Sequence, residues 1–375
     1  MTGRCVIDVN DLDGLFEVLT RRGYTIVGPT VRDQAIVYDE ISSPAELPIG
    51  WTDEQDGGYY RLRRREDQAR FGFAVGPQSF KQYQLPPDVT VMRARIDEDG
   101  ALADVSEPAR EPRRYAFLGA RSCELHAIEI LERVLLGGRY PDPADRARTD
   151  ELLIIAVQCG QAGGTCFCVS MNTGPVAQRG FDLALTEIID ADRHYFVVEV
   201  GSERGAQIVA EVAHADAAEV ELDAAQAVHE RTAAQMGREL DTTDIKQLLY
   251  RNQQHPRWDE VAGRCLTCGN CTMVCPTCFC TSVEDVTDLR GEHVERHQRW
   301  DSCFTVDYSY IHGGSVRNSS RSRYRQWMTH KLATWFDQFD SSGCVGCGRC
   351  ITWCPVGIDI TEEVRSIRAT DKGPS

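Results

Sequence analysis

The sequence predicts an α/β domain over residues 1–240, followed by an α-helical domain over residues 241–375. Three observations lead to this division. A strand, helix, strand order over residues 115–157 is typical of α/β domains with a parallel pair of strands. Two cysteine-rich runs of identical spacing lie near the C-terminal end, at residues 265–276 and 344–355. Between them, aromatic and apolar residues recur at helical spacing, which indicates an amphipathic helix.

The first hundred residues are expected to combine one helix with short strands. Apolar residues at helical spacing indicate a helix over residues 9–22, and β-forming residues indicate strands at residues 24–27 and 35–38. Arginines at residues 61–65 alternate as on an exposed strand, so we interpret them as a solvated face rather than a binding patch. The charged, proline-containing residues 97–114 are typical of a surface loop.

The strand, helix, strand unit delivers cysteines to one place. The strand over residues 115–119 leads into one cysteine and a helix, and the strand over residues 152–157 leads into a second cysteine. Because the carboxyl ends of parallel strands meet at the same edge of a sheet, we expect these two cysteines to meet. Two more follow in a glycine-rich stretch, where backbone can approach a bound group closely. This predicts a shared N-terminal site formed by Cys123, Cys159, Cys166 and Cys168.

The remaining elements lead to the second domain. Residues 181–187 and 195–200 are predicted strands, and residues 207–212 a helix. Residues 213–240 are rich in Ala, Glu and Asp with helical character, which suits a connector between domains. A helix over residues 243–253 then opens the second domain.

Each cysteine-rich run, here called a comb, places three cysteines three residues apart and a fourth four residues later, directly before a proline. This spacing lets three thiolates surround one [4Fe-4S] cubane while the fourth ligates the other cluster. Zinc knuckles are the alternative, but a zinc site needs only two cysteine pairs. The combs therefore predict two [4Fe-4S] clusters with crossed ligands: the first set is Cys265, Cys268, Cys271 and Cys354, and the second set is Cys344, Cys347, Cys350 and Cys275.

The last cysteine of the first comb and the first cysteine of the second are separated by the 68 residues 276–343, much more than the loop of a minimal two-cluster ferredoxin. The amphipathic helix over residues 324–339 leads into the second comb. A capping pattern from Asp359 to Glu362 starts a last short helix. The predicted fold class is therefore an α/β N-terminal domain plus an α-helical ferredoxin-type dicluster domain. The aromatic residues of the long helix are interpreted as core over the clusters rather than as an electron path.

Other cysteines extend the metal prediction. At the N-terminal site we expect a third iron–sulfur cluster, although the spacing of those four cysteines is less specific than a comb and they also fit small buried hydrophobes. With one more ligand, Cys278, Cys280 and Cys303 form a further candidate set. We favour the alternative that these three are buried thiols around a nearby cluster, where packing and hydrogen bonds to sulfur tune its potential.

Composition excludes several classes of function. Lys plus Arg number 41 and Asp plus Glu 57, so the net charge of −16 argues against nucleic acid or an anionic membrane surface as partner. The first ten residues contain no apolar signal core and the cysteines have metal-ligand spacing, so a reducing cytoplasm is the expected compartment. The longest aliphatic run, residues 152–157, is far shorter than the roughly 20 residues of a spanning helix.

Motifs for substrate chemistry are missing from the sequence. No Gly-x-Gly-x-x-Gly follows a strand as in dinucleotide-binding folds, and no phosphate-binding P-loop is present. A chain with at least two low-potential clusters and no recognisable substrate site is expected to move electrons rather than transform molecules.

Several sequence motifs other than the comb spacing narrow the choice of protein family. They are Cys275-Pro276-Thr277-Cys278-Phe279-Cys280, Trp300-Asp301-Ser302-Cys303, Arg323-Tyr324-Arg325 with Trp327 and His330-Lys331, Ala120-Arg121-Ser122-Cys123-Glu124-Leu125-His126-Ala127, and Thr165-Cys166-Phe167-Cys168 with Met171-Asn172-Thr173-Gly174-Pro175. With these, the sequence resembles the iron–sulfur beta subunit of cytosolic NAD(P)-linked nickel–iron hydrogenases, the sulfhydrogenases, and their relative, the A subunit of anaerobic sulfite reductase. The likeness covers most of the chain from about residue 115 onward.

The resemblance implies a non-catalytic electron-transfer subunit in a larger oxidoreductase complex. Its implied partners are a flavin- and NAD(P)-binding subunit and the small and large subunits of the hydrogenase. The two cysteine sets carry over residue by residue, whereas the third cluster is independent of the family. The alternative functions are an electron-input subunit of sulfite reductase and, from another class, an iron–sulfur sensor or scaffold. Both combs are complete, which favours electron transfer over a sensor with a labile cluster.

Overall fold

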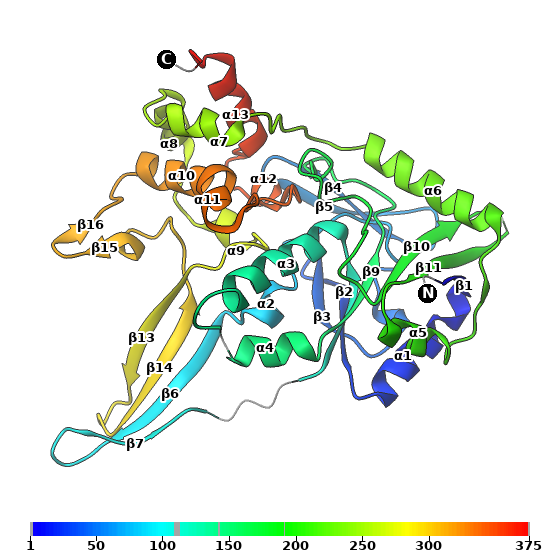
Figure 1. Cartoon of the computed structure of the whole chain (residues 1–375), viewed down its shortest axis with the longest axis horizontal. Coiled ribbons are helices and arrows are strands. Elements are labelled where there is room, and N and C mark those ends of the chain that lie inside the picture. The colour runs from blue at the N-terminus through cyan, green and yellow to red at the C-terminus, as the bar shows by residue number, and fades with distance from the viewer. Residues whose placement is uncertain (1–2, 109–112, 142, 191, 374–375) are drawn as a thin grey trace.

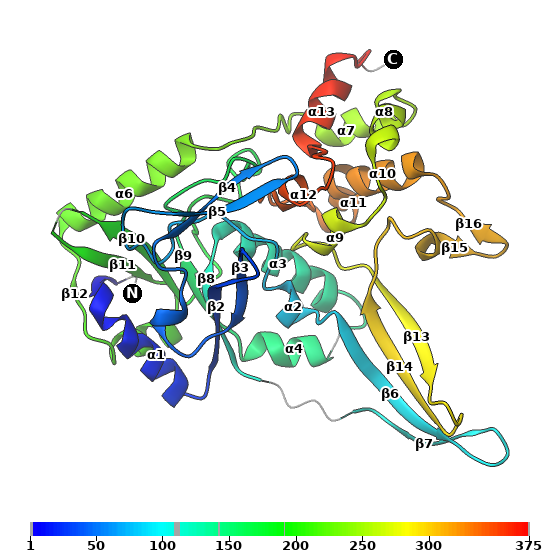
Figure 2. The same ribbon diagram turned by 180° about the vertical axis from the view of Figure 1, so that it is seen from behind.

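The computed structural model describes residues 3–108, 113–141, 143–190 and 192–373. An eight-stranded mixed sheet forms the centre of its N-terminal part (Figures 1 and 2). The strands lie in the order β12-β1-β11-β10-β9-β8-β2-β3. Their bounds are Ala215–Asp216 (β12), Arg4–Asp8 (β1), His194–Val200 (β11), Leu183–Ile189 (β10), Leu153–Val157 (β9), Tyr115–Ala120 (β8), Thr25–Arg32 (β2) and Ala35–Glu40 (β3).

Helices cover both faces of this sheet. On one face, α1 (Leu12–Arg21) and α5 (Glu203–Val209) pack on the largest apolar core. On the opposite face, α3 (Ser122–Leu136) contributes to a second core and α6 (Glu219–Ala234) to a third. Successive side chains of each strand point to opposite faces of the pleated sheet, so each strand contributes to the cores on both faces. The N-terminal region is therefore a mixed α/β structure, as the sequence predicts.

The predicted parallel pair is confirmed, because β8 and β9 run parallel with Leu118 opposite Ile155. Helix α4 (Pro143–Asp150) lies between α3 and β9 in the chain. Two other predictions are corrected. Residues 97–114 include the strand β7 (Leu102–Ser106), and residues 109–112 of that range lie outside the described residues. The expected connector contains α6, whose apolar face packs on β10 and β11 and so belongs to the sheet's core.

Short helices surround the two combs. They are α7 (Ile245–Arg251), α8 (Arg257–Arg264), α9 (Asn270–Met273), α12 (Arg349–Thr352) and α13 (Ile360–Ala369). The predicted long helix is present in three consecutive segments, which are α10 (Ser320–Thr329), the π-helical segment His330–Thr334 and α11 (Trp335–Phe339). Asp359 starts α13 by accepting a hydrogen bond from the Thr361 N–H at 2.9 Å.

Strands from both halves of the chain form an arm that projects from the body (Figures 1 and 2). Its order is β13-β14-β6-β7, with β6 at Asp88–Ile96, β13 at Thr281–Thr287 and β14 at His293–Trp300. The residues between the combs thus form strands as well as helices, including the small hairpin β15 (Tyr310–Ile311) and β16 (Gly314–Ser315). An all-helical second domain does not describe this arm, and the boundary at residue 240 stays a prediction.

Two smaller elements lie between the sheet and the combs. The ribbon of β4 (Trp51–Asp56) and β5 (Tyr59–Arg64) packs near α12. The short helix α2 (Lys81–Gln84) lies at the base of the arm. The arginines of β5 behave as expected for a solvated face, since Arg63 pairs with Glu54 at 2.9 Å and both are about half exposed.

Candidate iron–sulfur site

The first cysteine set surrounds a single cavity near the surface. Three of its members come from the first comb and the fourth, Cys354, from the second. Apolar and aromatic residues complete the lining, among them Phe304, Tyr324 and Trp327. Cys268 is exposed. Cys350 of the second comb also lines this cavity, and the crossed ligand sets stay a prediction.

The aromatic wall of this cavity supplies hydrogen-bond donors without partners. Tyr324 Oη and Trp327 Nε1 are buried, and within the described residues neither has a hydrogen-bond partner. Buried polar groups are normally paired. Sulfur atoms of an iron–sulfur cluster accept hydrogen bonds from surrounding groups, so the residues present fit such a group in this cavity.

The second cysteine set lies deeper. Burial, followed by the nearby thiols of Cys344, Cys347 and Cys275, raises the pKa of Cys350 well above its ordinary value. Burial also raises the pKa of Cys344 to about 12. Such thiols stay neutral unless a metal compensates their charge, because the thiolate is the form that binds metal and burial disfavours it. Three such thiols that converge with Cys275 fit a cubane better than they fit free thiols.

The N-terminal site is next to the second set. Burial, followed by Cys166, Cys159 and Cys347, raises the pKa of Cys168. Burial, followed by Cys347, Glu124 and Cys168, raises the pKa of Cys123. The Cys166 thiol lies 3.9 Å from the carbonyl oxygen of Cys347. The structure therefore brings all four predicted cysteines of the N-terminal site together, and it places them against the second comb.

A buried cation lies beside each of the three cysteine groups. Arg323, which is 6% exposed, opposes the rise in the pKa of Cys265 that burial causes. Lys331 donates to Cys275 Sγ at 3.1 Å. Arg121, which is 1% exposed, opposes the rise that burial causes in the pKa of Cys159, and donates to the carbonyl oxygens of Gln158, Phe71 and Phe73. Buried cations need negative charge nearby, which thiolates and a cluster supply.

The loop that carries Cys166 and Cys168 packs tightly on the second comb. Phe167 N donates to Gly346 O at 2.8 Å, and the Phe167 ring is 1% exposed in the core of the C-terminal part. A Cβ at Gly346, whose φ is +64°, would lie 2.7 Å from Cys168 Cα. At Gly174 a Cβ would lie 3.0 Å from Cys168 Sγ. Glycine at these positions therefore lets backbone approach the cysteines, as expected from the sequence.

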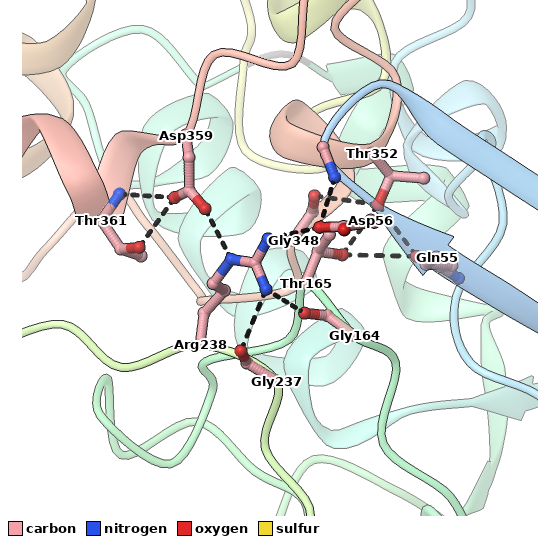
Figure 3. Close-up of polar contacts among 11 residues, drawn as sticks. Gln55, Asp56, Gly164, Thr165, Gly237, Arg238, Gly348, Thr352, Asp359 and Thr361 are labelled. Atoms are coloured by element: carbon pink, nitrogen blue, oxygen red, sulfur yellow. Dashed lines mark hydrogen bonds and ion pairs between the residues drawn. The ribbon is translucent and has the colours of Figure 1, made fainter.

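A polar network holds the same loop against β4 and α13 (Figure 3). Arg238 donates to Asp359 Oδ2 at 2.6 Å, to Gly164 O at 2.8 Å and to Asp56 Oδ1 at 2.5 Å. The hydroxyls of Thr165 and Thr352 lie 2.7 Å apart, and Thr352 donates to Gln55 Oε1 at 2.9 Å. These contacts fix the N-terminal site relative to the end of the second comb.

A buried ion pair joins the second comb to α3. Arg349 and Glu124 are both 1% exposed and form a short ion pair. Arg349 also donates to Gly76 O at 2.8 Å and to Gln78 O at 2.9 Å. Because Glu124 follows Cys123 and Arg349 precedes Cys350, this pair couples the position of the N-terminal site to that of the second set.

The remaining cysteines group in pairs. Cys278 hydrogen-bonds to Cys275, and Lys331 Nζ lies 3.7 Å from its sulfur. A hydrogen bond from the Cys303 thiol lowers the pKa of Cys280 to about 6.

Sequence reasoning missed Lys331, Arg121 and Arg349 as parts of the site. Arg121 and Arg349 lie beside or within cysteine motifs, which was their sequence signal, whereas Lys331 lies in the helix before the second comb; burial of all three charges is visible only in the fold.

Comparisons with known proteins agree with these observations. Residues 264–358 match a family described as a 4Fe-4S dicluster domain. The chain is similar to the sulfhydrogenase 2 subunit beta of Pyrococcus furiosus, with 33% identity over 258 residues, which is 67% of this chain and 74% of that protein. In the part of the chain that the structure describes, no helix has both the length and the apolar character needed to cross a membrane.

Proposed function

This chain belongs to the family of the iron–sulfur beta subunits of sulfhydrogenases, and we propose that it relays electrons between a flavin- and NAD(P)-binding subunit and a nickel–iron hydrogenase core. Iron–sulfur electron transfer as a hydrogenase subunit is the coarser function that the family supports. The identity of the neighbouring subunits and the direction of flow are the proposal. We also propose that residues 1–240 and 241–375 act as an α/β domain and a dicluster domain.

The observation that carries the proposal is the line of cysteine groups through the molecule. The first set lies around a cavity that includes the exposed Cys268, and the second set lies deeper. The N-terminal site follows beyond the second set, against Cys347. We assign a [4Fe-4S] cluster to each of the two sets and an iron–sulfur cluster to the N-terminal site. When bound, such clusters accept and release single electrons.

The surface over the first set suits an exchange of electrons with a partner. Leu266 is 60% exposed and Val356 is 40% exposed, and both line the cavity that Cys268 opens. Apolar side chains of this kind dock against a partner and exclude water. We therefore assign the first cluster to the contact with a redox subunit, and the inner groups to electron storage and onward transfer.

The test is iron and acid-labile sulfide per chain on the anaerobically purified native complex, with EPR of the reduced state and identification of co-purifying subunits. About twelve irons per chain together with a nickel-containing partner are expected, at about four irons per cluster. About eight irons would remove the cluster at the N-terminal site. A sirohaem partner in place of nickel would move the chain to sulfite reduction.

A matched pair of variants tests the N-terminal site directly. Cys166→Ala is expected to lower the iron content by about four per chain, because it removes one ligand of a single cluster. Cys5→Ala is the control, since Cys5 is buried in β1 and belongs to none of the cysteine groups. Equal iron in Cys166→Ala, Cys5→Ala and the unmodified chain would contradict the assignment.

A further inference from the structure

Lys331 is buried among cysteines instead of facing a carboxylate. It is 4% exposed, and in the described part of the chain no acidic side chain forms an ion pair with it. Its Nζ lies 3.1 Å from Cys275 Sγ, 3.1 Å from Thr277 Oγ1, 3.3 Å from Gly343 O and 3.7 Å from Cys278 Sγ. A buried ammonium group without negative charge nearby is costly, so thiolate sulfur is its counter-charge here.

The backbone fixes this lysine in place. Lys331 lies in the π-helical segment between α10 and α11, and such segments occur frequently at functional sites. Its carbonyl oxygen accepts a hydrogen bond from Gly343 N at 2.8 Å, directly before the second comb. Both ends of the residue are therefore attached to the segment that enters the second set, which leaves the ammonium group little freedom to move away from Cys275.

We propose that Lys331 raises the reduction potential of the second cluster by holding a positive charge against its ligand Cys275. The inference rests on the ligand assignment proposed above. One-electron reduction adds negative charge to a cluster, and a cation a few ångströms away stabilises that charge strongly inside a protein. Charge and hydrogen bonds at the ligand sulfur are established determinants of cluster potential. Because Lys331 acts through Cys275, it is a positioning residue.

A second buried lysine provides an internal comparison. Lys81 is also 4% exposed, but within the residues described its Nζ donates hydrogen bonds to carbonyl oxygens and none to a sulfur atom. It lies 3.2 Å from Cys278 O, 3.4 Å from Met273 O and 3.8 Å from the centre of the Trp300 ring. Removing its charge perturbs the same region without touching the ligand. Lys81→Met is therefore a matched control for Lys331→Met.

The experiment is an EPR-monitored redox titration of the native complex carrying Lys331→Met, which removes the charge and keeps the length of the side chain. We expect unchanged iron content and a lower midpoint for one cluster, with a change of about tenfold in its reduced-to-oxidised ratio at fixed potential, or about 59 mV for one electron. The affected signal should be the one that Cys344→Ser also alters. Lys81→Met should produce a clearly smaller shift.

Two outcomes would overturn the proposal. One is an unchanged midpoint in an iron-replete Lys331→Met protein, and the other is an equal shift in Lys81→Met. If Lys331→Met loses iron, Lys331→Gln is titrated in its place, because it keeps an N–H donor without the charge and should show the same lowered midpoint. Failure of the proposed function looks different, since the unmodified complex would then lack the second cluster's signal altogether.

Discussion

The two cysteines that precede prolines in the combs lie among the cysteines of the opposite comb. Cys354 shares a cavity with Cys265, Cys268 and Cys271. Cys275 acts on the pKa of both Cys344 and Cys350. Each of these two cysteines therefore lies near cysteines of the other comb, which is what crossed ligation requires.

Cys354→Ala tests crossed ligation at a single residue. The expected result is the loss of about four irons per chain from the first cluster, since Cys354 is its only ligand from the second comb. A lower Tm should accompany that loss, because metal binding and folding are coupled. Iron analysis and thermal unfolding of the purified complex measure both. A Cys354→Ala protein with its full iron content would show that the crossed assignment is wrong.

Among the elements, the loop over residues 163–174 makes the closest contact with the second comb. At Gly346 the backbones of the two segments are so close that an added Cβ would lie 2.7 Å from Cys168 Cα. The repeated sequence Thr-Cys-Phe-Cys occurs once in this loop and once after the first comb. Thr165 bonds to Thr352 and Thr277 donates to Gly343 O at 2.7 Å. The first copy therefore contacts the second comb itself, and the second copy contacts the residue directly before that comb.

Gly346→Ala is expected to separate these elements. Its left-handed φ of +64° costs a non-glycine residue roughly 1–2 kcal/mol, and the added Cβ would lie 2.7 Å from Cys168 Cα. We expect a loss of at least about 2 kcal/mol in the free energy of unfolding, measured by denaturant titration. The control is Gly160→Ala, because a Cβ there has no neighbour within 4 Å. Similar losses for both variants would contradict a specific close contact.

At the scale of the whole molecule, ion pairs, hydrogen bonds and a buried aromatic ring join the two halves. The Arg349–Glu124 pair, the Arg238 network and Phe167 all cross between the sheet and the combs. The central sheet has apolar cores that contain few cysteines, whereas the apolar core of the comb region includes Cys344 and packs against Cys265, Cys271, Cys350 and Cys354. The core of the comb region is therefore expected to depend on metal ligation more than the cores of the sheet do.

Iron removal should expose this difference. After anaerobic chelation, amide hydrogen exchange is expected to rise first in residues 265–276 and 344–355, because these segments carry the cysteine ligands and lose their metal bonds. Residues of β8, β9 and β10 should keep their protection, since they pair in the centre of the eight-stranded sheet. Uniform loss of protection along the chain would mean that the sheet does not fold independently of iron.

Docking at the first cluster is also a property of the assembled molecule. Leu266→Glu should slow electron exchange with the partner subunit by about tenfold or more without changing iron content, because it places a charge in the apolar surface around Cys268. Stopped-flow cluster reduction by NAD(P)H in the intact complex measures the rate. Leu289→Glu, at a fully exposed position between β13 and β14, is the control. Equal rates for the two variants would place the docking surface elsewhere.

The sequence by itself determined the chemistry of this protein. Comb spacing predicts clusters because iron ligation depends on local cysteine spacing, and the strand order around Cys123 and Cys159 predicts their meeting because parallel strands end at a common edge. The helical periodicity before the second comb and the family likeness are equally local properties of the chain.

Only the tertiary structure decided what surrounds the cysteines. Pairing of β6 with β14 joins residues about two hundred positions apart, and no local pattern specifies such a partner. The burial of Lys331, Arg121 and Arg349 is equally invisible in sequence, where a charged residue suggests solvent. A buried charge is tolerated only where the fold supplies its counter-charge, so the roles of these three residues depend on neighbours that are distant in the sequence.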